Sequence, residues 1–310
     1  MASHILKYSV FLQKYRTPLL ITCCGGVFAF NMFHHVFPGV SYRLLNQAWY
    51  HGGPATLSKN LEGVFQQVLM DYGISSPNNF SAFPSSGFHP IGAGVPWLPA
   101  GAHIGLPLNL NSTADDLSGI TKHTVVINDK RVDWNSDCGT TLKEALVFSP
   151  EAQKFAIARE VAVLQSGGPV VSAAVAPFCL GGVWVYSVVM KQVFQLHTGP
   201  VLLRAAVNIL ALGIGAVSYF FTSDAVNQWI DYSSDRHAAG LSRDYAKGGV
   251  EFYEKILSRN RVLCCLMGEK GKKTFAPSGN LLPAHFLQMK HTPCTSRRDR
   301  ILAALKEQEA

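Results

Sequence analysis

The sequence predicts a predominantly α membrane protein: three transmembrane helices with an α+β soluble domain formed from segments on either side of a helical hairpin. Charged residues make up only 15% of the 310 residues, against about 25% in a typical soluble domain, and apolar residues reach 48%. The charges are missing from three blocks, each close to the roughly 20 apolar residues that a helix needs to cross a bilayer. These blocks define the organisation of the chain.

The expected segments, in chain order, are a basic N-terminal segment (1–16), a transmembrane helix (17–37), a soluble α+β segment (38–169), a transmembrane helix (170–190), a short loop (191–200), a transmembrane helix (201–221), and a helical soluble segment with a basic tail (222–310). The second and third helices are apolar on every face, which is typical of membrane spans rather than core helices. The first carries Asn31, His34 and His35, so a buried core helix is its alternative.

The second and third helices are expected to form a tight hairpin. Gly199 and Pro200 end their short connection, because this pair interrupts a helix before the next one begins. Small residues let two helices approach closely in a membrane. We therefore expect the glycines of both spans to lie at the helix contact; they are Gly181, Gly182, Gly213 and Gly215.

The first sixteen residues indicate a mitochondrial location. They contain Lys7, Lys14 and Arg16, no acid, and apolar residues that gather on one helical face. This composition is more typical of a mitochondrial targeting segment than of a secretory signal, with a signal anchor as the alternative. Basic flanks stay on the matrix or cytosolic side, and Lys191 and Arg204 flank the hairpin loop. The large segments are therefore expected in the intermembrane space of a multi-pass inner-membrane protein.

Local patterns predict the elements of the soluble segments. Residues 57–74 form a helix with Ser58 as its cap and Gly73 as its stop, and residues 102–110 contain a strand. A hairpin over 123–134 turns at Asn128 and Asp129. The next helix has Ser149 as its N-cap and Pro150 in its first turn.

The segment after the third span is predicted to be helical, with a break at Gly248 and Gly249, and to end in a short amphipathic helix. The tail cluster of Arg297, Arg298 and Arg300 is expected on a solvated face, with contact to anionic lipid headgroups as its alternative. Cys264 and Cys265 are expected to be small buried side chains rather than a redox or copper site.

No phosphate-binding loop, nucleophile elbow or RNA-binding pattern is present, so the sequence gives no support for nucleotide, serine-hydrolase or nucleic-acid functions. One helix, FAIAREVAVLQ, stands where a membrane zinc peptidase carries HExxH, in which two histidines four residues apart bind zinc and the glutamate activates water. Arg159 and Val163 occupy the histidine positions and Glu160 keeps the glutamate. An arginine stays protonated and has no free lone pair for a metal.

Beyond the hairpin, DYSSDRHAAGLS resembles the stretch that supplies the third zinc ligand of those peptidases, with Asp231 in the ligand position and Asp235 in that of a following aspartate. His237 could ligate a metal in principle, but one histidine and one carboxylate make a poor zinc site. The layout therefore loosely resembles an inactive relative, a pseudoenzyme, of membrane-embedded HExxH zinc peptidases. We expect no catalytic, cofactor-binding or metal-binding residues.

The segments AQKFAIAREV, GGVEFYEKIL, PSGNLLP and the RRD of the tail resemble the transmembrane protein 177 family of the mitochondrial inner membrane. This resemblance implies a non-enzymatic role in the early biogenesis of cytochrome c oxidase. It implies as partners the newly made subunit II and its dedicated membrane chaperone, cytochrome c oxidase assembly factor twenty. We also expect contact with membrane lipid and no binding of nucleic acid. The alternatives are a metallopeptidase-like enzyme and a lipid-binding scaffold.

Overall fold

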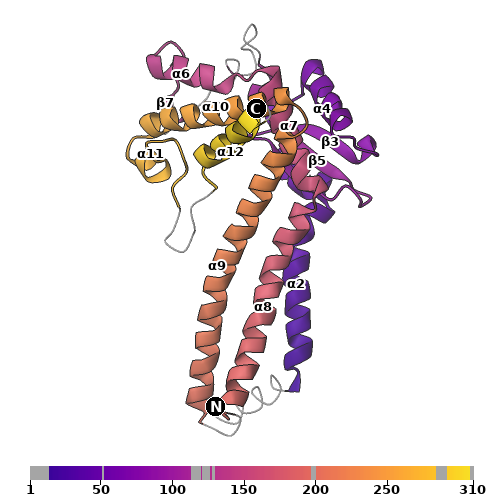
Figure 1. Ribbon diagram of the computed structural model, residues 1–310, viewed down its shortest axis with the longest axis vertical. Coiled ribbons are helices and arrows are strands. Elements are labelled where there is room, and N and C mark those ends of the chain that lie inside the picture. The colour runs from indigo at the N-terminus through magenta and orange to yellow at the C-terminus, as the bar shows by residue number, and fades with distance from the viewer. Residues whose placement is uncertain are drawn as a thin grey trace. The chain divides into compact units, whose positions relative to one another are not determined.

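The computed structural model describes residues 14–50, 52–112, 120, 126–127, 130–196, 200–283 and 292–307 (Figure 1). The predicted N-terminal segment lies almost wholly outside these residues. The chain divides into two compact units. We call residues 1–33 and 170–226 the span unit, and residues 34–169 and 227–310 the α+β unit.

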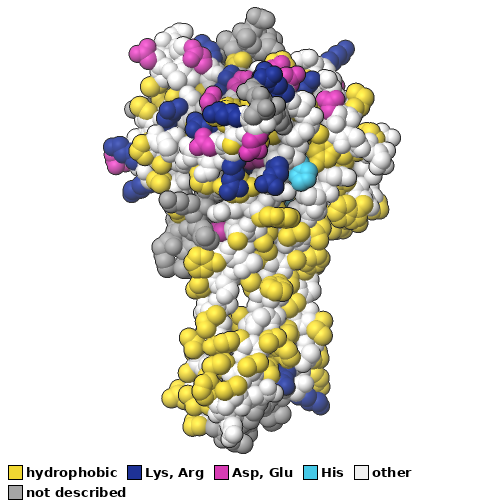
Figure 2. Space-filling model, viewed as in Figure 1, with side chains coloured by type: hydrophobic (Ala, Val, Ile, Leu, Met, Phe, Trp, Pro, Cys, Tyr) yellow, Lys and Arg dark blue, Asp and Glu magenta, His cyan; other side chains and the backbone are white. Residues whose placement is uncertain are grey.

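The span unit consists of three helices: α2 (Arg16–Val36), α8 (Gly168–Val193) and the first part of α9 (Val201–Ala239). All three are long and apolar enough to cross a membrane, which confirms the predicted spans. Figure 2 shows hydrophobic side chains over much of this unit, whereas charged side chains gather over the α+β unit. Helix α9 does not stop at residue 221, because DAVNQWIDYSSDRHAA contains no helix breaker and continues the same helix.

Contacts within the span unit involve fewer glycines than expected. A Cβ atom added to Gly215 would lie 2.0 Å from Cγ2 of Val183, so α8 and α9 meet closely there. At Gly181, Gly182 and Gly213 an added Cβ would meet nothing within 4 Å, so the expectation that all four glycines lie at the contact is wrong. These three glycines lie beside open space rather than against the neighbouring helix.

The α+β unit contains a three-stranded sheet of β3 (Phe80–Ser85), β4 (Ile91–Gly94) and β5 (Ala102–Pro107) in the order β3-β5-β4. Strands β3 and β5 are parallel, with Phe80 opposite Ala102, while β4 and β5 are antiparallel. The strand predicted within 102–110 is therefore present. Two small antiparallel pairs are β1 (Trp49–Tyr50) with β2 (Gly53–Pro54), and β6 (Val126–Ile127) with β7 (Lys130–Arg131). The last pair is the predicted hairpin, whose turn lies outside the described residues.

Two of the helices of this unit begin where the sequence predicts, directly after Ser58 and directly after Ser149. The helices are α3 (Arg43–Asn46), α4 (Lys59–Asp71), α6 (Asp137–Leu146), α7 (Pro150–Gln165), α10 (Arg243–Met267), α11 (Glu269–Thr274) and α12 (Cys294–Glu307). The Ser58 hydroxyl accepts a hydrogen bond from the backbone N–H of Leu61, and Ser149 caps α7 in the same way. Gly73 has a φ of +71°, the left-handed conformation that ends α4.

The predicted break at Gly248 and Gly249 is wrong. Helix α9 ends at Ala239, and α10 begins at Arg243 and runs straight through both glycines. An added Cβ would lie 2.2 Å from the carbonyl oxygen of Glu151 at Gly248, and 2.7 Å from the Phe155 ring at Gly249. The two glycines therefore let α10 approach the backbone of α7, and Gly240 follows the actual end of α9.

Helix α7 lies in the middle of the core of the α+β unit. The core cluster joins buried side chains of α4, β3, β5, α7, α10 and α12, including fully buried Phe155, Ile157 and Leu164 of α7. Residues on nearly every face of α7 are buried. Its polar residues near the centre, Arg159 and Glu160, must therefore find partners inside the protein.

Candidate functional site

Arg159 is the centre of a cluster of charged side chains. Its Nη1 donates a hydrogen bond to Oε1 of Glu160 at 2.8 Å, and its Nη2 donates to Oδ1 of Asp231 at 2.7 Å. Its Nε lies 3.3 Å from Oδ1 of Asp235. The three acidic residues that the sequence pattern singled out thus meet one guanidinium group.

A second guanidinium group comes from α12. Nε and Nη2 of Arg297 donate to the two carboxylate oxygens of Asp235 at 2.6 and 2.7 Å, and Nη1 lies 3.2 Å from Oδ1 of Asp231. Arg297 is only 7% exposed, so its expected place on a solvated face is wrong. The prediction fails because α12 packs its Arg297 face onto α10 and α9, whereas the neighbouring Arg298 pairs with Asp299 at the surface.

Tyr253 of α10 completes the cluster. Its hydroxyl donates to Oδ1 of Asp235 at 2.7 Å, its side chain is 1% exposed, and the guanidinium carbon of Arg297 lies 4.8 Å from the centre of its ring. Four helices, α7, α9, α10 and α12, therefore contribute to one set of side chains. We call it the charge cluster; its members are Arg159, Glu160, Asp231, Asp235, Tyr253 and Arg297.

The environment shifts the acidities of these groups. Burial raises the pKa of Glu160, an effect that the charge of Arg159 only partly offsets. Burial also opposes ionisation of Asp231, but Arg159 and Arg297 outweigh it and lower that pKa. Burial works against the charge of Arg159 as well, yet Tyr253 and the three carboxyl groups raise its pKa well above the usual value. Both arginines are therefore permanent cations that hold Asp231 ionised.

These residues do not fit a zinc ion. The lone pairs of Asp231 and Asp235 already accept hydrogen bonds or ion-pair contacts from Arg159 and Arg297. Val163 is half-buried and apolar, and Nδ1 of His237 lies 2.7 Å from the carbonyl oxygen of Ser233 on its own helix. No group of three metal-binding side chains suited to a metal ion occurs in the part of the chain that the structure describes. The carboxylates of the cluster are paired with the guanidinium groups of Arg159 and Arg297.

Sequence patterns missed two members of the charge cluster and one neighbour of it. Tyr253 and Arg297 stand far along the chain, although both lie in stretches that carried the family resemblance. Tyr42 lies near Glu160; burial and then the charge of Glu160 raise the pKa of Tyr42 to about 12. No periodicity connects residue 42 with residue 160, so only the folded chain reveals this contact.

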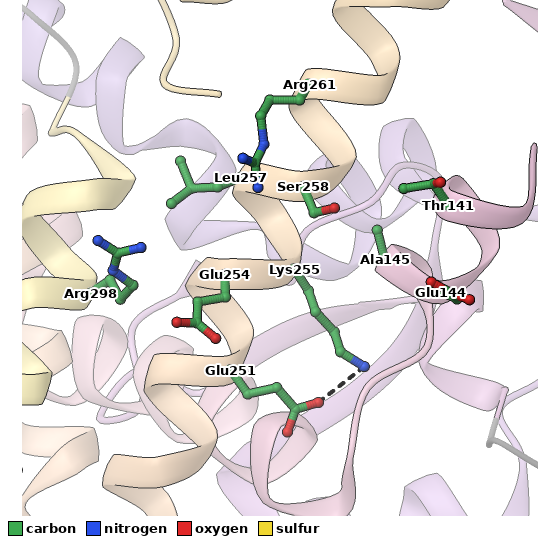
Figure 3. A pocket seen from close by; sticks show the side chains of 10 residues that line it. All are labelled: Thr141, Glu144, Ala145, Glu251, Glu254, Lys255, Leu257, Ser258, Arg261 and Arg298. Carbon is green, nitrogen blue, oxygen red and sulfur yellow. Dashed lines mark ion pairs between the residues drawn. The ribbon is translucent and has the colours of Figure 1, made fainter. Parts of the chain in front are cut away.

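A groove of about 430 Å³ lies between α6, α10 and α12 (Figure 3). Acids and bases alternate along it: Glu251 and Glu254 stand beside Lys255, Arg261 and Arg298. The Lys255 Nζ lies 3.1 Å from Oε1 of Glu251, an ion pair within α10. This mixed-charge lining is typical of a solvated surface rather than of a site that gathers one kind of group.

The cysteine pair lies differently from the prediction. Cys264 is half-buried and Cys265 is exposed, so the expectation that both are buried is wrong. The thiol of Cys265 lies within hydrogen-bonding reach of Cys138 on α6 and raises the pKa of that thiol. All seven cysteines are free.

Comparisons with known proteins find relatives that are similar over nearly the whole chain. The family model described as Transmembrane protein 177 matches residues 92–290. A relative named Transmembrane protein 177 from Danio rerio is 60% identical over 308 residues, covering 99% of each chain. The proteins of that name from Xenopus laevis and Homo sapiens are 47% and 43% identical, each covering at least 96% of both chains.

No solved structure matches the chain, so its likeness to zinc peptidases stays a prediction from the sequence. The family match extends over more than half of the chain and the relatives over nearly all of it, including the spans and the charge cluster. The chain belongs to the transmembrane protein 177 family.

Proposed function

We propose that this protein is a non-enzymatic assembly factor of the mitochondrial inner membrane that acts in cytochrome c oxidase biogenesis. It stabilises newly made subunit II and the dedicated membrane chaperone of that subunit, cytochrome c oxidase assembly factor twenty. The family resemblance supplies these partners. The structural observation that supports a non-enzymatic role is the position of Arg159, which offers its charge to three carboxyl groups where a peptidase needs a metal.

The chemistry of the charge cluster favours a structural role for its members. A catalytic zinc site keeps three protein ligands and an open position for water. Here Glu160 is buried and its carboxylate accepts a hydrogen bond from Arg159, whereas a peptidase needs that carboxylate to face a zinc-bound water. The cluster instead joins α7, α9, α10 and α12 by directed ion pairs, which fix the shape of the surface that the α+β unit presents.

Stabilisation of a partner follows from mass action. A protein that binds only the folded form of its partner stabilises that form by about 2.7 kcal/mol when its concentration is 100 times the dissociation constant. Three apolar spans and an α+β unit joined to them offer both membrane and aqueous contact surfaces to such a partner. A lipid scaffold would need the spans alone.

Loss of the protein tests the partner assignment. In cells without it, the amount of the chaperone should fall, and the full-length chain should restore it. Pulse-labelled subunit II should co-purify with the protein from membranes dissolved in mild detergent. Recovery of unrelated outer-membrane or cytosolic proteins alone would refute the assembly role and favour the scaffold.

Metal analysis tests the non-enzymatic assignment. The purified full chain should contain far less than one zinc ion per molecule, and Glu160→Gln should still sustain the chaperone. One zinc ion per chain, together with peptide cleavage that Glu160→Gln abolishes, would restore the peptidase alternative.

Protease accessibility tests the location and orientation. After rupture of the outer mitochondrial membrane, added protease should cut both the 38–169 and the 222–310 segments. Lys191 and Arg204 near the hairpin loop motivate this expectation. A C-terminal tag that stays protected until detergent is added would reverse the orientation while leaving three spans in place.

A further inference from the structure

Three cationic side chains converge at one end of the span unit. Arg16 begins α2, Lys191 lies in the last turn of α8, and Arg204 lies in the first turn of α9. Arg16 and Lys191 line the same cavity, and the positive charges of Arg16 and Arg204 both repel that of Lys191. A ligand of opposite charge would relieve this repulsion.

Among the residues that the structure describes, no acidic side chain supplies that opposite charge. Every ion pair between described residues lies in the α+β unit. The described part of the span unit contains one acidic residue, Asp224, which is 20 positions along α9 from Arg204. At 1.5 Å per residue that is about 30 Å away. The three cations therefore face their surroundings without an acidic partner.

A cavity of about 350 Å³ begins at two of these cations and extends along the three helices. Arg16 and Lys191 line it, and its remaining wall comes from all three helices. On α8 the wall extends from Lys191 back to Leu180, about 16 Å along the helix axis at 1.5 Å per residue. The apolar part of the wall consists of Leu20, Leu180, Val183, Val188, Ala211 and Leu212.

Two polar features interrupt this apolar wall. The Ser187 hydroxyl donates to Oδ1 of Asn208 at 2.9 Å, which satisfies the serine and joins α8 to α9. The indole Nε1 of Trp184 is buried, and among the described residues it has no hydrogen-bond acceptor. A buried indole N–H normally has an acceptor, so a molecule bound in the cavity would be expected to supply an oxygen to this donor.

The occupant must therefore combine a negative charge, an oxygen acceptor slightly deeper in the membrane, and a long apolar part. A free phosphate or other small anion would make no contact with the apolar wall, and a neutral lipid would not compensate the charge of the three cations. Basic pockets between transmembrane helices bind anionic lipid headgroups for these reasons. We propose that this end of the span unit is a binding site for an anionic phospholipid, whose phosphate lies among Arg16, Lys191 and Arg204 and whose acyl chain follows the apolar wall.

Trp184 makes the site measurable. The full-length protein, purified in mild detergent, is titrated with phosphatidylglycerol whose acyl chains carry bromine, and separately with phosphatidylcholine brominated in the same way. Bromine quenches a nearby indole, so the anionic lipid should quench part of the tryptophan fluorescence at lower concentration. Trp184→Phe should remove that extra quenching, because the other four tryptophans lie outside the cavity.

Charge variants test which side chains hold the phosphate. Each basic side chain near anionic lipid contributes roughly a factor of five, so Arg16→Gln with Lys191→Gln should weaken phosphatidylglycerol binding about 25-fold. Lys272→Gln with Lys273→Gln removes the same charge from the exposed end of α11 and should change nothing. The charge-keeping pair Arg16→Lys with Lys191→Arg should retain binding, which separates charge from folding.

Three results would overturn the proposal. The first is equal quenching by the two lipids, and the second is extra quenching that survives Trp184→Phe. The third is displacement of the anionic lipid by millimolar glycerol phosphate, which would identify a site for a small anion instead. Because these measurements use no partner protein, their outcome is independent of the role in cytochrome c oxidase biogenesis.

Discussion

The two groups of cations in this protein have opposite surroundings. In the α+β unit, Arg159 and Arg297 are largely buried and share three carboxyl groups at distances of 2.6 to 3.3 Å. In the span unit, Arg16, Lys191 and Arg204 make no ion pair with any described residue. The first group has its counter-charges from the chain, whereas the second has none among the described residues.

This difference predicts what removal of a charge will do. A buried arginine whose partner carboxylate stays behind leaves an uncompensated charge in a low dielectric, which is among the most destabilising changes known. A cation that repels its neighbours and faces solvent or headgroups leaves nothing unpaired when it is removed. The following predictions compare the two groups and the packing around them, from the largest expected effect to the smallest.

The charge cluster should be intolerant of losing Arg297. Arg297→Met keeps much of the side-chain volume but leaves Asp235 without its bidentate partner, so we expect a loss of about 3–5 kcal/mol in the free energy of unfolding. Denaturant unfolding of the purified protein in detergent measures it. Arg298→Met, one residue along α12 and half-exposed, should cost less than about 1 kcal/mol. Equal losses would mean that the cluster contributes nothing particular.

The packing of α10 on α7 should be nearly as sensitive. In Gly248→Ala the new Cβ would lie 2.2 Å from a backbone oxygen, which cannot move aside like a side chain, so we expect a loss of about 1–3 kcal/mol. Gly181→Ala in α8 meets nothing within 4 Å and should be neutral or slightly stabilising. Thermal unfolding of both variants compares the two units, and a destabilised Gly181→Ala would contradict the open space beside that glycine.

Glu160 should give the cluster a pH dependence. The folded-state pKa of Glu160 is raised above 4.5, so the stability that it contributes is present below that pH and is lost as pH rises through the folded pKa. Gln cannot ionise, so Glu160→Gln should gain stability relative to the unmodified protein as pH rises from 4.5 toward 7. Unfolding free energies measured across that range test it; a difference that is constant with pH would show that Glu160 does not titrate there.

Asp231 should behave in the opposite sense. Its folded-state pKa is lowered below 3.8, so its contribution is present above that pH and is lost as pH falls through the folded pKa. Asp231→Asn should therefore lose stability relative to the unmodified protein near neutral pH, and the difference should shrink on acidification below pH 3.8. A difference that grows on acidification would reverse the assignment of its ionised form.

The basic end of the span unit should show the smallest change. Without added lipid, Arg16→Gln with Lys191→Gln removes mutual repulsion and breaks no ion pair, so the unfolding free energy should change by less than about 1 kcal/mol. The same thermal scan used for Gly248→Ala measures it. A loss as large as that of Arg297→Met would mean that these cations are structural.

Local sequence was sufficient for much of the fold. Charge-free stretches determine the three spans because a bilayer tolerates few charges, and this rule needs no tertiary contact. Ser58 and Ser149 begin their helices for an equally local reason, since each hydroxyl accepts from a backbone N–H three residues ahead. The strand at Ala102–Pro107 also follows from local alternation.

Local sequence predicts poorly those features that depend on a neighbouring helix. Gly248 and Gly249 indicate a helix break in isolation, and only the backbone of α7 shows that they permit close packing. Of the four glycines predicted at the contact between α8 and α9, three lie beside open space, because composition does not reveal which face of a helix meets another. In each case the deciding partner is remote in sequence.

The charge cluster likewise has features that follow from the sequence and features that follow only from the fold. The sequence by itself determined which side chains are present, and it predicts that Arg159 and Val163 stand where a zinc peptidase has its ligands, accompanied by Asp231 and Asp235. Only the tertiary structure decided what these residues do instead: it buried Arg297 and Tyr253 against them, 62 and 18 residues from Asp235. The sequence specifies which side chains carry charge. The free energy of each charge depends on its burial and its ion-pair partners, and these are determined only when the chain folds.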